Sequence, residues 1–456
     1  MRRVLMISPH FPPDSTAGTH RVRLLAPHLQ AHGWEPTVLT VDPRDYEGRL
    51  DPALAASVPP DLRVVRCRAW PASRTRPFGI GDLGLRALRG LEVASVELMS
   101  RETFDALFIT IYPTYPALLG PWLKKRFGVP FVLDYQDPWV GEWGRSVGAG
   151  ANGHADLKSR ATRALARRLE PIALGAADAV TAVSRATFEQ ALARNPNAKP
   201  VTTAELPIGW DARDLEWLQQ YRTRRATAAS AAEFRLSYVG TLLPTGLDTV
   251  RTFFAGIARF RRQTPALAER LRVRFVGTSN QRSSDVPRTV APIAHQFGLD
   301  HIVAEEPERL DYFDALDTLA SSDGVLLLGS REPHYTPSKV FPALLSERPL
   351  LALLHEASTA VDLLRRAGGP PWIRTVTYGN GKSGDNVGIV AEHLREMLAS
   401  RVNGAPRVDR ETLASTSACV LARTLARVLD TVSSRKSQVS SRKSATRSRS
   451  AALSDS

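Results

Sequence analysis

Short apolar runs rich in β-branched residues alternate with segments of helical spacing along most of this chain. In residues 2–41, one such run is followed by a loop rich in proline and glycine, a helical segment and a second run. Parallel strands need a helical crossover between them, so this unit predicts the start of a doubly wound parallel sheet. Further strand-like runs cover residues 61–69, 104–111, 130–139 and 177–184.

The same pattern restarts near residue 233. Strand-like runs then cover residues 234–242, 271–279, 301–306, 323–330, 349–356 and 372–379. A chain of 456 residues, 43% of them hydrophobic, is long enough for two buried cores. We therefore predict an α/β fold with two Rossmann-like, doubly wound parallel-sheet domains that face each other across a cleft. Ligands of such sheets bind at the carboxyl ends of the strands.

The predicted boundaries follow changes of composition along the chain. They give an N-terminal domain over residues 1–211, a bridging segment over 212–232, a C-terminal domain over 233–400, a closing helix over 401–432 and a basic tail over 433–456. We expect the closing helix to pack back toward the N-terminal domain. The tail is rich in serine, arginine and lysine and lacks aromatic residues, which predicts disorder.

The formal net charge is +14, and part of it lies in the tail, which has six basic residues and one aspartate. Basic surface attracts nucleotides, nucleic acid or an anionic membrane, although arginine bias in a genome gives the same composition. Nucleic-acid binding would rest on the tail alone and is the weakest of these. Two cysteines form no disulfide framework, and no window of eighteen apolar residues predicts a transmembrane helix. The first apolar run is too short for a signal peptide, so we expect a cytoplasmic protein.

A loop of small residues, 13–21, connects the first strand to the first helix. Gly18 permits close backbone approach, and a helix start offers N–H groups to an anion such as a phosphate. Arg21 is suited to pairing with a phosphate or a carboxylate. The loop lacks a full Gly-x-Gly-x-x-Gly pattern, so an ordinary turn and a solvated arginine remain the alternatives.

Two carboxylates and an indole follow the apolar strand near residue 131. The positions of Asp134, Asp137 and Trp139 put them at a carboxyl edge of the sheet. Carboxylates there bind sugar hydroxyls, and tryptophan offers an apolar face to a sugar ring. Asp137 has an alternative role as a cap of the turn before Pro138.

The C-terminal half has two turns that suit a phosphate. Gly240 and Thr241 end its first strand, where a backbone N–H and a hydroxyl are available. In residues 330–350, a strand leads into a segment that begins with a good N-cap and proline pair, followed by Ser338 and Lys339. A helix N-terminus with a cation beside it favours a diphosphate, and Arg331 lies just before it.

Several catalytic motifs are missing from the sequence. It contains no Asp-x-Asp, no His-Glu-x-x-His, no Cys-x-x-Cys and no Gly-x-x-x-x-Gly-Lys-Ser/Thr. These absences argue against a bound metal and a P-loop. We expect neither a metal nor a cofactor.

Residues 3–40, 129–139, 236–257 and 336–353 together resemble family 4 glycosyltransferases with the two-domain glycosyltransferase B architecture. The resemblance covers about residues 1–432. It implies metal-independent transfer, with retention, of a sugar from a nucleotide diphosphate sugar bound on the C-terminal domain to a polysaccharide, glycolipid or small molecule on the N-terminal domain. Asp137 matches the aspartate of the family's Arg-Asp-x-Trp pattern, with Gln136 where arginine is usual, and is the predicted catalytic residue. Gly18, Gly240, Ser338 and Lys339 match donor-phosphate positions.

The chain departs from the family at the donor site. Thr241 and Thr245 stand where many members have arginine and lysine, and His334 and Pro342 stand where many have a pair of glutamates. Pro342 lies about six residues past Thr336, the predicted cap of this helix, and is expected to remove one backbone hydrogen bond and bend the helix. These departures keep open a second hypothesis, a weakened relative that binds a sugar nucleotide or a partner without turnover. An epimerase of the same architecture is a third.

Residues 79–99 mix leucine with Arg86 and Arg89 at helical spacing. This pattern suits a helix lying on an anionic membrane at the inner face, and it equally suits an ordinary surface helix of the N-terminal domain.

Overall fold

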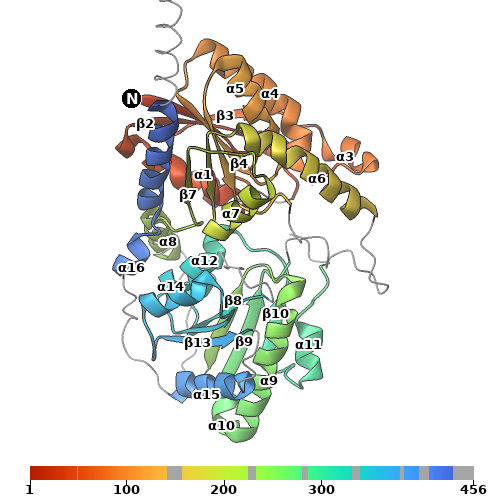
Figure 1. Cartoon of the computed structure of the whole chain (residues 1–456). Coiled ribbons are helices and arrows are strands. Elements are labelled where there is room, and N and C mark those ends of the chain that lie inside the picture. Colours follow the sequence, from red (N-terminus) through yellow and green to blue (C-terminus); the bar gives the residue numbers. More distant parts are fainter. Residues whose placement is uncertain are drawn as a thin grey trace, which may run out of the picture. The chain divides into compact units, whose positions relative to one another are not determined.

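The computed structural model describes residues 1–48, 50–140, 157–223, 233–279, 286–330, 339–379, 385–399 and 410–434 (Figure 1). Contacts divide the chain into two compact units. Unit 1 comprises Met1–Gly209 together with the described residues from Ala418 onward, and unit 2 comprises Trp210–Ser417. Each unit contains one parallel sheet covered by helices, which confirms the predicted α/β class with two Rossmann-like sheets.

Unit 1 has a seven-stranded sheet in the order β3-β2-β1-β4-β5-β6-β7. The strands are β1 (Arg2–Ile7), β2 (Trp34–Val41), β3 (Arg63–Cys67), β4 (Ala106–Ile111), β5 (Phe131–Tyr135), β6 (Ala179–Ala182) and β7 (Thr202–Glu205). Its helices are α1 (Thr19–Leu25), α2 (Pro52–Ala56), α3 (Ala72–Thr75), α4 (Leu83–Arg101), α5 (Leu119–Phe127), α6 (Leu157–Ala176) and α7 (Arg185–Arg194), with short 3-10 turns η1 (Ala26–His28), η2 (Gln30–His32), η3 (Pro43–Asp45), η4 (Arg76–Phe78) and η5 (Tyr115–Leu118). The strand order reverses between β1 and β4.

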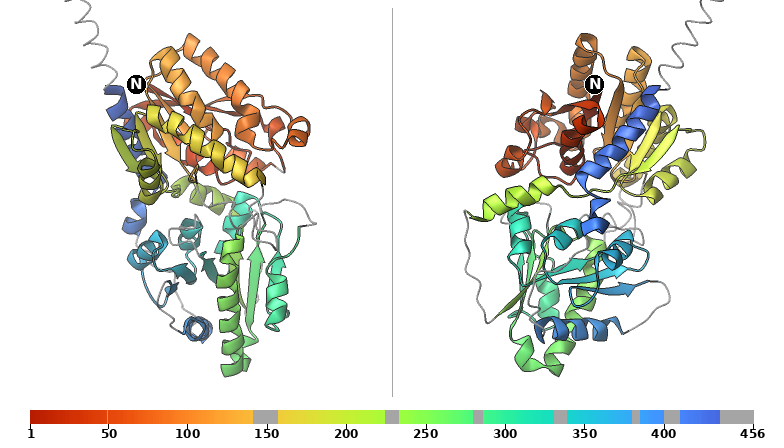
Figure 2. Two further views of the ribbon diagram at one scale, coloured as in Figure 1. Left: turned by 45° about the vertical axis from the view of Figure 1, so that its right-hand side comes forward. Right: turned by 90° about the vertical axis from the view of Figure 1, so that its left-hand side faces the viewer.

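Both faces of this sheet are buried. Because successive side chains of a strand point to opposite sides, each strand contributes residues to two cores. On one face, Leu5 and Ile7 of β1 join a core with α4, α5 and α6. On the other face, Val4 and Met6 pack with α1 and with a helix over residues 418–434 (Figure 2). The end of the described chain thus completes the core of the N-terminal unit.

Unit 2 has a six-stranded sheet in the order β10-β9-β8-β11-β12-β13. The strands are β8 (Phe234–Val239), β9 (Leu271–Val276), β10 (Val303–Glu306), β11 (Gly324–Leu328), β12 (Leu350–His355) and β13 (Ile373–Tyr378). The helices are α8 (Ala212–Thr223), α9 (Leu247–Gln263), α10 (Pro265–Ala268), α11 (Ala291–Gln296), α12 (Tyr312–Ala320), α13 (Val340–Leu345), α14 (Thr359–Ala367), α15 (Asn386–Ala399) and α16 (Arg410–Ala414), with the 3-10 turn η6 (Pro244–Gly246). Here the strand order reverses between β8 and β11.

The expected bridging segment begins as a helix of unit 2. In α8, the Trp217 ring lies 5.8 Å from the Phe313 ring of α12, and Tyr312 donates a hydrogen bond of 2.8 Å to Asp214. The unit boundary falls between Gly209 and Trp210, and the rest of the expected bridge, 224–232, lies outside the described residues.

The closing helix predicted over residues 401–432 is interrupted in its described part, so the prediction of one continuous helix is wrong. α16 ends at Ala414, and a second helix runs over residues 418–434, beyond the predicted end at 432. The hydroxyls of Ser415, Thr416 and Ser417 each donate to a backbone carbonyl three residues earlier, which competes with helical hydrogen bonds. The remaining tail, 435–456, lies outside the described residues.

The helix expected over residues 79–99 is α4, and its apolar face is not available to a membrane. Leu83, Leu91 and Leu98 are buried in the core of unit 1, and Arg86 is buried as well. Arg89 is exposed and pairs with Glu92 at 2.7 Å. α4 is therefore a packed helix of the sheet. No helix in the described part of the chain is both long and apolar enough to cross a lipid bilayer.

Candidate functional site

Lys339 lies at the point of unit 2 where the strand order reverses. Its amine donates a hydrogen bond of 2.5 Å to the hydroxyl of Tyr238 on β8 and another to the carbonyl oxygen of Thr241. Tyr238 donates to that same carbonyl at 3.0 Å. In doubly wound sheets, the crevice outside this reversal point is where ligands bind. The amine therefore marks the ligand edge of unit 2.

Gly240 makes this arrangement possible. Its φ of +114° is a conformation that side-chain-bearing residues rarely adopt. A Cβ atom at this position would lie 2.7 Å from Cε of Lys339. The backbone turn after β8 thus requires glycine at position 240 for two reasons: its φ angle is unfavourable for other residues, and a larger side chain would collide with Lys339.

The surroundings of Lys339 weaken its positive charge. Burial is the main cause and the charge of Arg309 the second, and together they lower the pKa of Lys339 from 10.5 to about 7. The described residues place no carboxylate in an ion pair with this amine. An anionic ligand would supply the missing countercharge and restore the protonated form.

The neighbouring strand β11 ends in a braced turn. Tyr378 donates a hydrogen bond of 2.9 Å to the carbonyl of Ser330, and Thr249 donates one of 3.3 Å to the carbonyl of Gly329. Both strand ends that flank the reversal point are therefore held by side chains from elsewhere in unit 2. The buried hydroxyl of Thr245 has no hydrogen-bond partner among the described residues, so it remains able to bond a ligand.

The predicted bend at Pro342 is wrong, because the described helix α13 begins only at Val340. Pro342 is then the third residue of the helix. The backbone N–H of a residue at this position has no acceptor within the helix, so a proline there removes no helical hydrogen bond. Its carbonyl still accepts a hydrogen bond of 3.0 Å from Ser346. The predicted donor residues Arg331 and Ser338, and His334 with them, lie outside the described residues.

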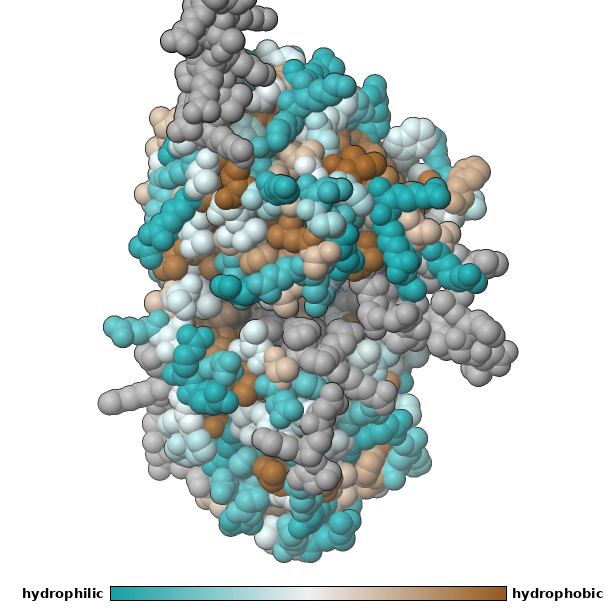
Figure 3. All heavy atoms as spheres, in the orientation of Figure 1, coloured by the Kyte–Doolittle hydropathy of each residue, from teal (hydrophilic) through white to brown (hydrophobic). Residues whose placement is uncertain are grey.

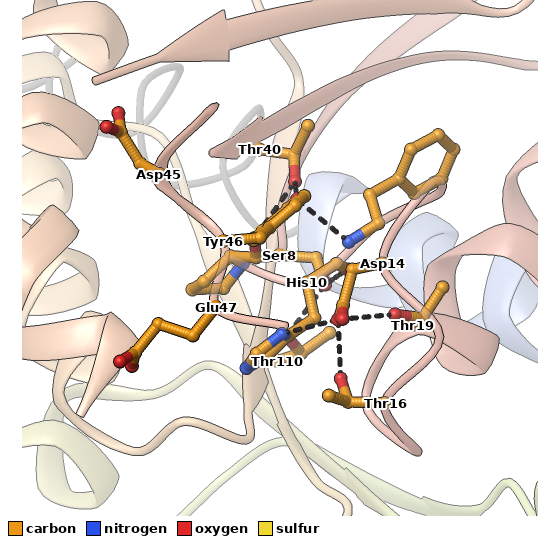
Figure 4. Close-up of polar contacts among 12 residues, drawn as sticks. Ser8, His10, Asp14, Thr16, Thr19, Thr40, Asp45, Tyr46, Glu47 and Thr110 are labelled. Atoms are coloured by element: carbon orange, nitrogen blue, oxygen red, sulfur yellow. Dashed lines mark hydrogen bonds and ion pairs between the residues drawn. The ribbon is translucent and has the colours of Figure 1, made fainter. Parts of the chain in front are cut away.

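Unit 1 has a polar cluster at its own reversal point, between β1 and β4 (Figure 4). Nδ1 of His10 lies 2.7 Å from the carboxylate of Asp14. The hydroxyls of Thr16 and Thr19 donate to the same carboxylate at 2.6 and 3.0 Å. The three side chains converge on Asp14, so the loop after β1 is organised around one carboxylate.

The carboxylate of Asp14 stays ionised despite its burial. Burial raises its pKa, but the hydrogen bond and charge of His10 and the two threonine hydroxyls lower it, and the resulting pKa is about 2. In the tautomer of His10 that donates a hydrogen bond from Nδ1 to this carboxylate, Nε2 carries the lone pair. The described residues give Nε2 no hydrogen-bond partner.

Two aromatic rings fix the plane of the His10 ring. Tyr46 stacks at 6.3 Å and Tyr112, which follows β4, stacks at 5.6 Å. Gly18 lies against Tyr112, since a Cβ atom there would be 2.6 Å from the tyrosine ring. Gly18 has an ordinary helical φ of −59°, so this close approach, and not an unusual turn, requires the glycine.

The structure brings Arg21 and Asp134 together, but in the interior. Nε of Arg21 lies 2.9 Å from Oδ2 of Asp134, and both side chains are at most 1% exposed. Thr181 donates to the other oxygen of Asp134 at 2.7 Å, and Arg21 donates to the carbonyl of Pro207 at 3.2 Å. The predicted contact of these two residues with an acceptor or sugar is therefore wrong, because they bind each other.

Trp139 is also buried, at 2% exposure, in the core of unit 1. Its ring meets the edge of the Tyr115 ring at 6.5 Å, so it offers no exposed face to a sugar and that prediction is wrong as well. Asp137 is exposed just beyond the end of β5. Among the described residues, no group of three or more His, Cys, Asp and Glu side chains is arranged to hold a metal ion.

Sequence reasoning missed His10, Asp14, Tyr46, Tyr112 and Tyr238. Only for His10 and Asp14 does the sequence contain a pattern that could have indicated the site. Polar residues directly after a buried first strand lie at the ligand edge of the sheet. The tyrosines reach the two clusters through the fold, and no spacing in the sequence indicates this.

Residues 16–207 match the family described as glycosyl transferase 4-like domain. This part of the chain is thus a glycosyl transferase 4-like domain. This match confirms the resemblance that the sequence motifs indicated. No functionally curated protein matches the chain.

Solved structures share the fold of this protein over nearly its whole length. A trehalose-phosphate synthase from Burkholderia vietnamiensis is 14% identical with a TM-score of 0.60, and the match covers 94% of this chain and 97% of that one. The Anabaena protein Alr3699/HepE, solved with UDP and glucose, is 14% identical with a TM-score of 0.52 over 97% and 100%. The catalytic domain of Arabidopsis thaliana starch synthase IV, bound to ADP and acarbose, is 12% identical with a TM-score of 0.53 over 95% and 99%. At these identities the likeness shows the glycosyltransferase B fold.

Proposed function

We propose that this glycosyltransferase moves a sugar from a nucleotide diphosphate sugar to a saccharide, lipid-linked or small-molecule acceptor, with retention at the anomeric carbon and without a metal or other cofactor. The observation that carries the proposal is the amine of Lys339, held between Tyr238 and Thr241 at the reversal point of unit 2. Three of the structures with the same fold contain UDP, UDP-glucose or ADP, which supports a nucleotide diphosphate as the donor's leaving group.

The chemistry asks for a fixed positive group near the leaving phosphate. Negative charge grows on the nucleotide diphosphate as the glycosidic bond breaks, and a preorganised cation stabilises that charge without reorganisation. Lys339 meets this requirement, because Gly240 lets it cross the turn and two hydrogen bonds fix its amine. The backbone of Gly240 and the hydroxyl of Thr245 complete the proposed donor side, together with Arg331 and Ser338, which lie outside the described residues.

The acceptor side is proposed to lie in unit 1 at the His10 cluster. Nε2 of His10 is oriented by Asp14 and by two stacked tyrosines, and it is able to accept a hydrogen bond from a sugar hydroxyl. Asp137, exposed beyond β5, is a second proposed sugar contact at the same edge of the sheet.

A panel of nucleotide diphosphates and their sugars tests the proposal. We expect at least one to raise the melting temperature of the full chain, with or without EDTA. The matching donor sugar should then be hydrolysed slowly, and NMR should detect the released sugar first in the anomeric form that the donor had. If no nucleotide stabilises the protein, the proposed function is wrong.

A second candidate function is binding without turnover. It is favoured by Pro342, which stands where many family members have a glutamate and which has no side-chain group to hold a ribose. Stabilisation by a nucleotide sugar without hydrolysis or transfer to any tested acceptor would support this reading and contradict turnover.

Replacing His10 by alanine is expected to lower turnover about tenfold to 100-fold, because one positioned hydrogen-bond acceptor is lost from the acceptor side. The thermal shift caused by the donor should stay unchanged, since His10 belongs to unit 1 and Lys339 to unit 2. Asp14→Asn should give an intermediate loss, because the imidazole remains but its orientation weakens. A His10→Ala enzyme with turnover within twofold of wild type would contradict the assignment.

A further inference from the structure

Three large apolar side chains are exposed on the segment between β3 and α4. Trp70 is 62% exposed, Phe78 83% and Ile80 38%. The short helices α3 and η4 lead from Trp70 to Phe78. Their seven residues extend roughly 12 Å along the helix axes. We call these three residues, together with the exposed Arg66 and Arg74, the Trp70 surface. Helix α3 of this segment lies at an edge of unit 1 (Figure 1), and the face of the molecule seen in Figure 3 mixes apolar and hydrophilic side chains.

The backbone under this surface is held firmly. The guanidinium of buried Arg86 donates to the carbonyl of Trp70 at 2.8 Å and to that of Asp45 at 3.3 Å. The N–H of Trp70 donates back to the carbonyl of Arg86 at 2.9 Å. Gly90 of α4 approaches the carbonyl of Arg68 so closely that a Cβ atom would lie 2.0 Å from it. The fold therefore presents the aromatic side chains to solvent from an ordered base.

The charges around these side chains are mainly positive. Residues 66–80 contain four arginines and no acidic residue. Arg68 pairs with Asp45 at 2.7 Å and Arg76 with Glu47 at 2.7 Å. Arg66 and Arg74 have no ion-pair partner among the described residues, so their charges remain available to an anionic partner.

We infer that the Trp70 surface docks this protein on an anionic lipid bilayer. Trp and Phe side chains favour the boundary between headgroups and acyl chains, and arginines beside them bind lipid phosphates. Exposed aromatic side chains with unpaired arginines nearby in the sequence fit that boundary on both counts. The inference is independent of the proposed function, since no residue of the surface belongs to either half of the candidate site.

The test is co-sedimentation of the full chain with vesicles of phosphatidylcholine alone and of phosphatidylcholine mixed equally with phosphatidylglycerol. We expect wild type to bind the anionic vesicles, and Trp70→Ser/Phe78→Ser to bind them at least about tenfold more weakly. Val93→Ser/Ile389→Ser is the matched control, because these residues are exposed to 49% and 42% elsewhere on the chain. All substituted side chains are exposed, so thermal melts should show unchanged folding.

The basic tail also attracts anionic vesicles, so a readout that reports on Trp70 itself is needed. Lipids brominated on their acyl chains should quench part of the tryptophan fluorescence of wild type, and Trp70→Phe should lose that part while still sedimenting. Arg66→Gln/Arg74→Gln should weaken binding to anionic vesicles and leave the quenching depth unchanged. Failure of wild type to bind, equal binding by Trp70→Ser/Phe78→Ser, or quenching that persists in Trp70→Phe would each overturn the inference.

Discussion

Replacing Lys339 by methionine should lower donor turnover by about 100-fold or more and should also stabilise the ligand-free protein. The loss of turnover follows from removing one preorganised cation from the leaving phosphate, an effect of about 100- to 1000-fold in comparable sites. Methionine keeps the length and apolar stem of lysine, so the turn at Gly240 should not collapse. Steady-state kinetics with the donor identified in the nucleotide panel measures the first effect.

The gain in stability follows from the pKa of Lys339. Burial first and Arg309 second lower it to about 7 in the folded protein, well below its value of 10.5 in the unfolded chain. Folding therefore penalises the protonated amine. The penalty is complete below about pH 7, shrinks as the pH rises toward 10.5 and is absent above that pH. Lys339→Met should raise the free energy of unfolding by about 2 kcal/mol at pH 6, with a smaller gain at pH 9.

If Lys339→Met lowers turnover but raises the free energy of unfolding, Lys339 binds the ligand; a lysine with only a structural role would lower stability when replaced. Lys199→Met, at an exposed position of unit 1, is the matched control and should change neither quantity. Donor affinity of wild type should fall as the pH rises above about 7, and that of Lys339→Met should be flat. Turnover within threefold of wild type in Lys339→Met would remove this residue from the donor site.

The architecture was largely predictable because most inner strands are continuous apolar runs. All five residues of β5 and all six of β4 are buried, as expected for a parallel sheet covered on both faces. β7 was missed because its residues Thr202–Glu205 alternate between partly buried and exposed and are mostly polar, as at a sheet edge. The break at residues 415–417 was missed because hydroxyl groups that bond backward to carbonyls leave no trace in the apolar pattern.

The candidate site was predictable in position but not in composition. Lys339 was found from the strand and helix start around it, yet its partner Tyr238 is 101 residues away and no pattern connects them. Asp134 and Asp137 have the same sequence context, and only the three-dimensional position of Arg21 decides which carboxylate is inside. Polar residues at a strand end therefore predict the ligand edge, whereas their individual roles depend on contacts between distant segments.

Removing one partner of the buried pair between Arg21 and Asp134 should be the most destabilising change in unit 1. Asp134→Ala is expected to lower the free energy of unfolding by about 3–5 kcal/mol, because the guanidinium would remain buried without a countercharge. Arg21 has no alternative acceptor nearby apart from the carbonyl of Pro207, and its Nη2 atom already has no hydrogen-bond partner among the described residues. Chemical denaturation of the full chain, followed by fluorescence and circular dichroism, measures the change.

Two further variants separate loss of charge from loss of volume. Asp134→Asn keeps the size of the side chain and a hydrogen bond from Thr181, so a loss close to that of Asp134→Ala would assign the effect to the charge. Arg21→Met/Asp134→Leu removes both charges and should recover most of the stability, since an apolar pair of similar volume avoids the desolvation of two ions. Donor-induced thermal shifts should persist in this double variant, because the pair contacts neither Lys339 nor Gly240. If the double variant is as unstable as Asp134→Ala, packing around the pair, and not the unpaired charge, is the cause.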